Sequence, residues 1–145
     1  MGVGLRIFIV NDDNSLERLS LKKYERVMKR DPDISFPQYA GKRVRYAEVA
    51  IEFENRKPVE ILRMEYFIMH FDSKGRIDGT VRDDIMSLGV NLTPPIHFET
   101  DTVVIDAQHH FAKKRFDHQF RWKPTSEIEM AILKAIFKNK AMIYI

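Results

Sequence analysis

The sequence predicts an α+β protein: a mostly antiparallel, curved sheet of about five strands with two main helices packed on it. Three observations lead to this prediction. The stretch 43–72 contains two runs that alternate apolar and polar residues around a short polar turn, which is typical of a half-buried β-hairpin. A similar alternation predicts a second hairpin at 102–123. Two stretches, about 20–30 and 126–138, place apolar residues at helical spacing.

The composition limits the classes of function. The chain has 145 residues, so we expect a single globular domain over 1–145. It contains no cysteine, which excludes disulfides, thiolate catalysis and Cys-ligated metals and is typical of a cytoplasmic protein. No apolar run is long enough to span a membrane, so no membrane partner is expected. The formal net charge of +3 is compatible with an anionic partner without requiring one.

The first expected elements are a strand and a helix. The apolar run LRIFIV predicts a short buried strand at Leu5–Val10. Ser20, or Asn14 further upstream, can cap the helix expected at about 20–30. Asp31–Pro32 ends that helix, because the residue before a proline is disfavoured in the helical region.

The register of the first hairpin, 43–72, follows from its apolar pattern. If the turn lies at Asn55–Pro58, one face becomes continuously apolar, as a sheet packed on a core requires. The expected facing pairs are Ala47 with Tyr66, Val49 with Met64, and Ile51 with Leu62.

The other face of this hairpin places like charges opposite each other. Glu48 is expected to face Glu65, with Arg63 diagonal to Glu48. Facing carboxylates destabilise a sheet unless a neighbour neutralises them or a ligand uses them. We favour the interpretation that Arg63 bridges both glutamates at the surface. The alternative is that these three residues line a ligand-binding pocket.

Between the hairpins the sequence predicts a turn, a short helix and a loop. Gly75 ends the turn that begins at Asp72, because glycine readily adopts a positive φ. The pattern at Thr80–Leu88 predicts the short helix, and two prolines close the loop expected at Val90–Pro95.

The second hairpin, 102–123, has the densest set of chemically active side chains. With its loop at 112–115, His109 faces His118 and Ile105 faces Trp122. Two histidines are too few for a metal site, so we predict no metal and no cofactor. As a surface for single-stranded nucleic acid or a phosphate ligand, residues 107–123 offer cations at the tip and aromatics for stacking. The candidate nucleic-acid contacts are Lys113, Lys114, Arg115, Arg121 and Lys123, and the candidate ligand contacts are His109, His118 and Trp122.

The C-terminal region predicts a helix and a last strand or tail. Ser126 with Glu129 makes a capping box that begins the helix at 126–138. Ala141–Ile145 is either a strand or a tail used at a subunit contact.

No motif in the sequence identifies a reaction. The chain lacks G-x-S-x-G, a Gly-rich phosphate loop and H-E-x-x-H, so an enzyme using His and carboxylate acid–base chemistry is the less favoured interpretation. We expect a non-enzymatic binding or interaction module. We also expect a homo-oligomer, because the face with Tyr46 and Phe67 and the apolar C-terminus exceed what one domain can cover.

Overall fold

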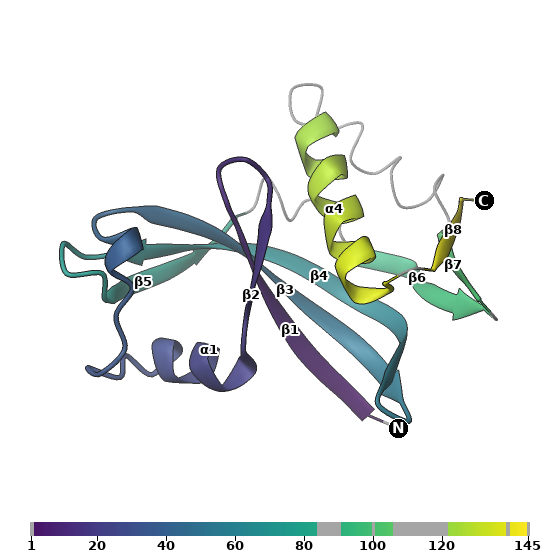
Figure 1. Cartoon of the computed structure of the whole chain (residues 1–145), viewed down its shortest axis with the longest axis horizontal. Coiled ribbons are helices and arrows are strands. Elements are labelled where there is room, and N and C mark those ends of the chain that lie inside the picture. The colour runs from purple at the N-terminus through teal and green to yellow at the C-terminus, as the bar shows by residue number, and fades with distance from the viewer. Residues whose placement is uncertain (1, 84–90, 100, 106–121, 139, 145) are drawn as a thin grey trace.

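The structure is a computed structural model that describes residues 2–83, 91–99, 101–105, 122–138 and 140–144 (Figure 1). Its strands form one open sheet of eight, in the order β2-β1-β3-β4-β6-β7-β8, and β5 also pairs with β4. The strands are β1 (Gly2–Val10), β2 (Leu16–Leu19), β3 (Arg43–Glu54), β4 (Lys57–Phe71), β5 (Ile77–Arg82), β6 (Asn91–Glu99), β7 (Thr102–Ile105) and β8 (Ala141–Tyr144). The described helices are α1 (Leu21–Met28), α4 (Trp122–Ile136) and a short 3-10 helix at Pro37–Tyr39. All strand pairs are antiparallel except β7 with β8.

Strands β3 and β4 form the predicted long hairpin, and most of its register is confirmed. Ala47 pairs with Tyr66 and Val49 with Met64. Beyond them the register shifts at a β-bulge, so Ile51 pairs with Ile61. The predicted pairing of Ile51 with Leu62 is therefore wrong, because Leu62 is the extra residue of the bulge.

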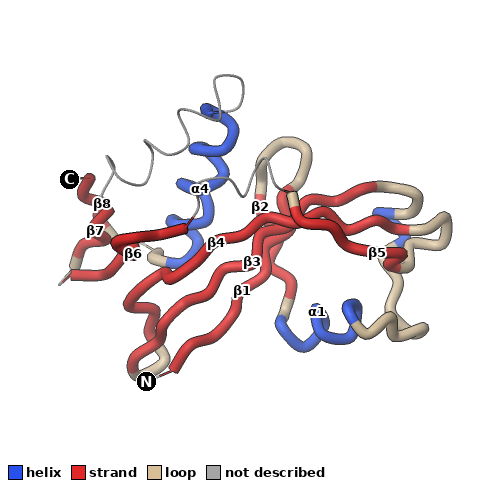
Figure 2. Tube along the Cα trace, turned by 180° about the vertical axis from the view of Figure 1, so that it is seen from behind, coloured by secondary structure: helices blue, strands red, loops and turns tan. Residues whose placement is uncertain are grey.

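The sheet carries two hydrophobic cores, one on each face and towards opposite ends (Figure 1, Figure 2). Neighbouring residues of β3 alternate between them, since successive side chains of a strand point to opposite faces. Ala47 belongs to the core under α4, and Tyr46 to the core under α1. The α4 core includes Phe8, Val10, Val49, Ile51, Ile61, Met64, Tyr66, Ile96, Val103, Ile105, Ile128, Ile132 and Leu133. The α1 core consists of Ile7, Ile9, Leu19, Val27, Phe36, Val44, Tyr46, Met69 and Phe71.

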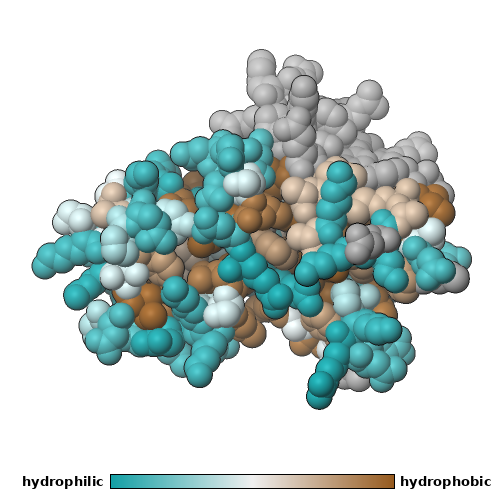
Figure 3. All heavy atoms as spheres, in the orientation of Figure 1, coloured by the Kyte–Doolittle hydropathy of each residue, from teal (hydrophilic) through white to brown (hydrophobic). Residues whose placement is uncertain are grey.

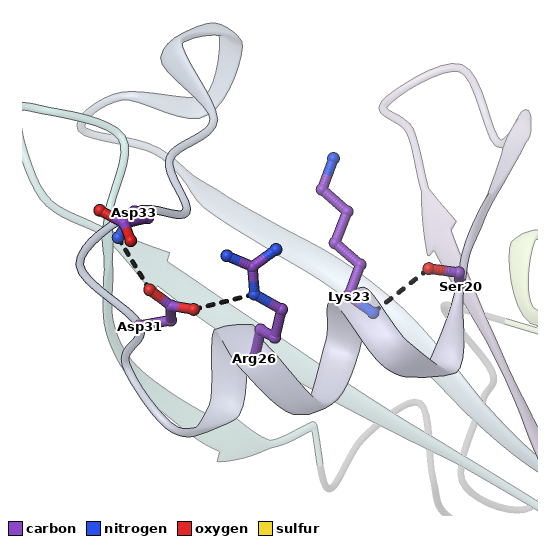
Figure 4. A network of polar contacts seen from close by, with 5 residues as sticks. All are labelled: Ser20, Lys23, Arg26, Asp31 and Asp33. Carbon is purple, nitrogen blue, oxygen red and sulfur yellow. Dashed lines mark hydrogen bonds and ion pairs between the residues drawn. The ribbon is translucent and has the colours of Figure 1, made fainter.

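Helix α1 begins and ends where the sequence predicts, and side chains close both ends (Figure 4). Ser20 Oγ accepts a hydrogen bond from the Lys23 backbone N–H at 3.2 Å, which confirms the predicted N-cap. Beyond the last turn, Arg26 Nε donates to Asp31 at 2.8 Å. Asp31 also accepts from the backbone N–H of Asp33 at 2.9 Å, so the chain leaves the helix in a fixed direction.

The α1 core removes one premise of the predicted self-association. Tyr46 is 2% exposed within a single chain, and its ring stacks on Phe67 with centroids 5.3 Å apart. Tyr24 of α1 packs against Tyr46 in an edge contact at 5.7 Å. The expectation that one chain cannot cover this face is therefore wrong, and self-association itself stays a prediction.

The sheet has more strands than the predicted five because β2, β5 and β6 are strands where none was predicted, and because the C-terminus adds β8. Leu16–Leu19, which would be helical if Asn14 were the cap, is a strand that pairs with β1. Ile77–Arg82 is a strand where the predicted helix at Thr80–Leu88 should begin, and residues 84–90 lie outside the described part. The predicted loop at Val90–Pro95 is largely part of β6.

The predicted hairpin at 102–123 is wrong in its pairing. Thr102–Ile105 is a strand, but its partners are β6 on one side and β8 on the other. Ile105 therefore pairs with Tyr144, and the predicted partner Trp122 is the first residue of α4. Residues 106–121 lie outside the described residues.

Helix α4 confirms the predicted C-terminal helix but starts earlier. Ser126 lies inside the helix, so it is not the N-cap of the predicted capping box. Glu129, the other member of that box, is 0% exposed instead of lying at a helix end. After α4, the chain forms β8, which confirms the strand alternative for the C-terminus. Neither described helix has the length and apolar character needed to cross a membrane.

Candidate functional site

The structure brings Glu48, Arg63 and Glu65 together as predicted. Glu48 and Glu65 face each other across β3 and β4. The Arg63 guanidinium lies between them, with Nε 3.1 Å from Glu65 and Nη2 3.8 Å from Glu48. The predicted bridge by Arg63 between the two glutamates is therefore confirmed.

Two tyrosines extend this polar network under α1. The Tyr24 hydroxyl lies 3.3 Å from the Tyr46 hydroxyl and donates to Glu48 at 3.2 Å. Burial, the hydrogen bond to Tyr46 and the nearby charge of Glu48 raise the pKa of Tyr24 well above its ordinary value. Burial also raises the pKa of Tyr46, so both hydroxyls stay protonated in neutral solution. The network thus attaches α1 to the sheet, and ligand binding by Glu48, Arg63 and Glu65 stays a prediction.

The other predicted site residues fall mostly outside the described part of the chain. Trp122 and Lys123 are the first residues of α4, not the end of a hairpin strand. The residues outside the described ranges are His109, Lys113, Lys114, Arg115, His118 and Arg121.

A groove that the sequence did not predict lies at the end of the sheet where β1 ends and β3 begins, beside the β1–β2 turn. Its floor is built by one row of the register, in which Val10 pairs with Arg45 and Arg45 with Ile68. The hollow has a volume of about 550 Å³. Its lining is Val10, Asn11, Asp12, Asn14, Gln38, Tyr39, Lys42, Arg43, Val44, Arg45 and Ile68.

The β1–β2 turn forms one wall of the groove and is held by its own side chains. Asn11 Nδ2 donates to Ser15 Oγ at 3.0 Å. Asp13 accepts hydrogen bonds from the Ser15 hydroxyl at 2.5 Å and from the Ser15 backbone N–H at 3.0 Å, and these bonds lower the pKa of Asp13. Asn14 has φ of 66°, a conformation in which asparagine is enriched. These contacts hold the turn that brings Asn11 and Asn14 into the lining of the groove.

The opposite wall belongs to the segment that leads into β3. The Tyr39 hydroxyl donates to Glu17 at 3.1 Å, and burial together with this bond raises the pKa of Tyr39 to about 12. Tyr39 therefore ties this wall to β2, on which Glu17 lies. The Gln38 amide lies beside it in the lining.

Three cations enter the groove, and only one is neutralised by a carboxylate in the described residues. Arg45 Nε lies 3.1 Å from Asp83, whose side chain is 8% exposed. Lys42 and Arg43 have no carboxylate within ion-pair distance in the described ranges. Asp12 is the one carboxylate of the lining. The groove therefore carries net positive charge beside side-chain amides, a combination suited to an oxyanion.

The described surface is largely polar on one side of the molecule (Figure 3). On the side of the molecule drawn in Figure 3, hydrophilic side chains cover most of the described surface. In the described part of the chain no three His, Asp or Glu side chains are grouped so as to hold a metal ion.

One sequence signal for the groove was available. Lys42, Arg43 and Arg45 place three cations within four residues at the start of a predicted strand. The signal was incomplete, because the walls come from the distant segments 11–14 and 38–39. Comparison with protein-family models, with curated proteins and with solved structures found no match for this chain.

Proposed function

We propose that the protein is a non-enzymatic binding module that holds a phosphate or similar oxyanion in the groove between the β1–β2 turn and the start of β3. The observation that carries this proposal is the position of Lys42 and Arg43. Both side chains line the hollow without a carboxylate partner in the described residues. Uncompensated cations attract anions, and a bound anion weakens the electrostatic repulsion between Lys42 and Arg43.

The form of the groove supports a ligand of modest size. Its volume of about 550 Å³ lies within the usual range for small-molecule sites, roughly 300–1,000 Å³. Arg45 adds a guanidinium group to the groove. The hydrogen bond from its Nε to the Asp83 carboxylate fixes the orientation of this group. Charge-assisted hydrogen bonds from such a group are about twice as strong as neutral ones.

The test is direct binding of phosphate ligands to paired variants. Isothermal titration calorimetry measures the affinity for ATP, with inorganic phosphate as a minimal competitor. The Lys42→Gln/Arg43→Gln variant is expected to lose about tenfold in affinity for each charge removed. The wild-type affinity is expected to fall steeply as salt is added.

The matched control removes two exposed cations outside the groove lining, Lys22 in α1 and Lys29 at its C-cap. Lys22→Gln/Lys29→Gln changes the net charge equally but leaves the groove intact. Equal weakening in both variants would show a general charge effect and overturn the proposal. ATP binding unaffected by Lys42→Gln/Arg43→Gln would overturn it as well.

The nucleic-acid alternative at 107–123 can be separated from the groove by one further variant. Replacing Lys113, Lys114 and Arg115 with alanine removes the tip cations of that prediction. If this variant loses oligonucleotide binding while Lys42→Gln/Arg43→Gln keeps it, the alternative is supported and the groove is not the site.

Self-association is retained as part of the proposal, through the apolar C-terminus, one of the two surfaces predicted from the sequence. β8 is an outer strand of the sheet, and its Ile143 is 44% exposed. Outer strands with exposed apolar side chains pair readily with another chain. Sedimentation at micromolar concentration is expected to show an oligomer that Ile143→Lys dissociates, whereas Val3→Lys on β1 leaves it intact. A cytoplasmic location is retained on the cysteine-free composition.

A further inference from the structure

A second cationic hollow lies on the α4 face of the sheet, between the β1–β2 ladder and the end of α4. Its volume is about 230 Å³. Three cations surround it: Arg6 from β1, Arg18 from β2 and Lys138 just after α4. Phe8 and Leu16 contribute an apolar part of the lining.

The strand register explains why the two arginines converge. Phe8 pairs with Arg18 across β1 and β2, and Arg6 lies two residues before Phe8 on the same face. Arg6 and Arg18 are therefore diagonal neighbours, a distance within reach of long side chains. The Arg6 guanidinium is also held over the Phe53 ring, 5.2 Å from its centroid.

These cations lack a neutralising partner among the residues that the structure describes. In the described ranges no carboxylate lies within ion-pair distance of Arg6, Arg18 or Lys138. Burial, and then the charge of Arg18, lower the pKa of Arg6. Like charges gathered at a hollow destabilise the fold, and a bound anion removes that cost.

The two hollows are connected by β1. Arg6 lines the second hollow and Val10 lines the groove, four residues apart on the same face. At the rise of a strand this separation is about 13 Å. The positive charge of the groove is thus continued across the β1–β2 hairpin by Arg18, Arg6 and Lys138.

We infer that Arg6, Arg18 and Lys138 form a second anion site, and that the ligand is an extended chain of phosphates that spans both hollows. This inference rests on the proposed function and narrows its ligand class to a linear polyanion. The backbone of a single-stranded nucleic acid and linear inorganic polyphosphate share this chemistry. Each phosphate neutralised by a cation releases a bound counter-ion, so occupancy of both hollows appears as a steeper salt dependence.

The experiment compares ligands of two lengths on the full chain. Fluorescence anisotropy, with salt varied, measures binding of a deoxythymidine dodecamer, and unlabelled linear polyphosphate competes for it. ATP serves as a compact probe that fills the groove alone. The variant is Arg18→Gln/Lys138→Gln, because both side chains are exposed and their replacement should not affect folding. Lys22→Gln/Lys29→Gln is again the equal-charge control.

The variant is expected to lose affinity for the dodecamer but not for the compact ligand ATP. Arg18→Gln/Lys138→Gln should weaken dodecamer binding at least tenfold and lower the magnitude of its salt slope by about 1.4, which is 0.7 for each lost contact with a single strand. ATP affinity should change less than about twofold. Competition by polyphosphate that the same variant weakens would support the inference and show that the bases are not required.

Two outcomes would overturn the inference, and they are distinguishable. If Lys42→Gln/Arg43→Gln weakens the dodecamer but Arg18→Gln/Lys138→Gln does not, the second site is refuted and the proposed function stands. If neither variant differs from the control, both the inference and the proposed function fail.

Discussion

Arg45 on β3 donates from Nε to the Asp83 carboxylate at 3.1 Å, directly after the end of β5. The Asp83 backbone N–H also donates to the Tyr66 carbonyl of β4 at 2.8 Å. One residue thus ties the end of β5 to β4 through its backbone and to β3 through its side chain. The same contact orients the guanidinium that lies in the floor of the groove.

Arg45→Gln should destabilise the protein by about 1–2 kcal/mol, because it leaves the Asp83 carboxylate buried without its cation. The expected loss of stability is smaller than for a fully buried ion pair, because the Arg45 side chain is 35% exposed and solvent screens its charge. Urea denaturation measures the change. In the Asp83→Asn background the same substitution should cost clearly less, and equal losses in both backgrounds would contradict the coupling.

Gly75→Ala should destabilise the protein by about 2 kcal/mol or more. Gly75 has φ of +78°, and a Cβ atom there would lie 2.4 Å from the Phe36 carbonyl oxygen. Gly41 is the matched control, because its φ is +70° but a Cβ atom would meet nothing within 4 Å. Gly41→Ala should therefore cost only about 1 kcal/mol from backbone strain. Equal melting temperatures for the two variants would show that the close approach to Phe36 is absent.

Arg63→Gln should destabilise the hairpin by about 0.5–1 kcal/mol at low salt, because Glu48 and Glu65 then face each other without a bridging cation. The effect should shrink as salt is added, since screening weakens the repulsion. Adding Glu65→Gln to Arg63→Gln should restore most of the loss. A double variant less stable than Arg63→Gln would mean that Glu65 has another favourable contact.

Stability should fall in acid partly through Asp72. Its carboxylate accepts from the backbone N–H groups of Lys74 at 2.8 Å and Arg76 at 3.0 Å, and these bonds lower its pKa from the ordinary 3.8. A lowered folded-state pKa contributes stability above the unfolded pKa, and that stability is lost as the pH falls through the folded value. Asp72→Asn should thus lose less stability than the wild type below about pH 4. The measurement is chemical denaturation across this range, with Asp78→Asn as the control; parallel curves for wild type and Asp72→Asn would refute the role.

The long hairpin could be predicted from the sequence because the residues that determine its register all lie within the hairpin. Val49 and Met64 share the buried face, and the short turn between β3 and β4 selects the register that also places Glu48 opposite Glu65. The α1 cap was equally readable, since Ser20 and Asp31 act on residues close in the chain. Interactions between residues that are close in the chain can be recognised from a short stretch of sequence.

Short outer strands left weaker signals. Leu16 packs on the α4 core and Leu19 belongs to the α1 core, so β2 contributes to both faces and shows no simple alternation. In β6 the two prolines predict a loop, but the ladder with β4 has a register shift between Ile61 and Arg63, opposite this part of the strand. Proline is tolerated where a ladder is interrupted.

The partners of β7 could not be read from neighbouring sequence. Its alternation correctly predicts a strand, and local reasoning then pairs it with the next alternating run. The structure instead pairs Thr102 with Glu99 and with Ala141, the second across a parallel connection that contains α4. The groove was missed for the same reason, because Asn11 and Lys42 are brought together only by the fold.

The alternation of β3 between two cores has a consequence for how the protein opens. The β3 amides at Tyr46 and Ala47 lie between a side chain of the α1 core and one of the α4 core. Detaching either helix leaves the strand anchored by the other, so these amides become accessible to solvent only when both layers are lost. Hydrogen exchange at the centre of β3 therefore reports the free energy of global unfolding, whereas the amides of β2 and β8 exchange through smaller, independent openings.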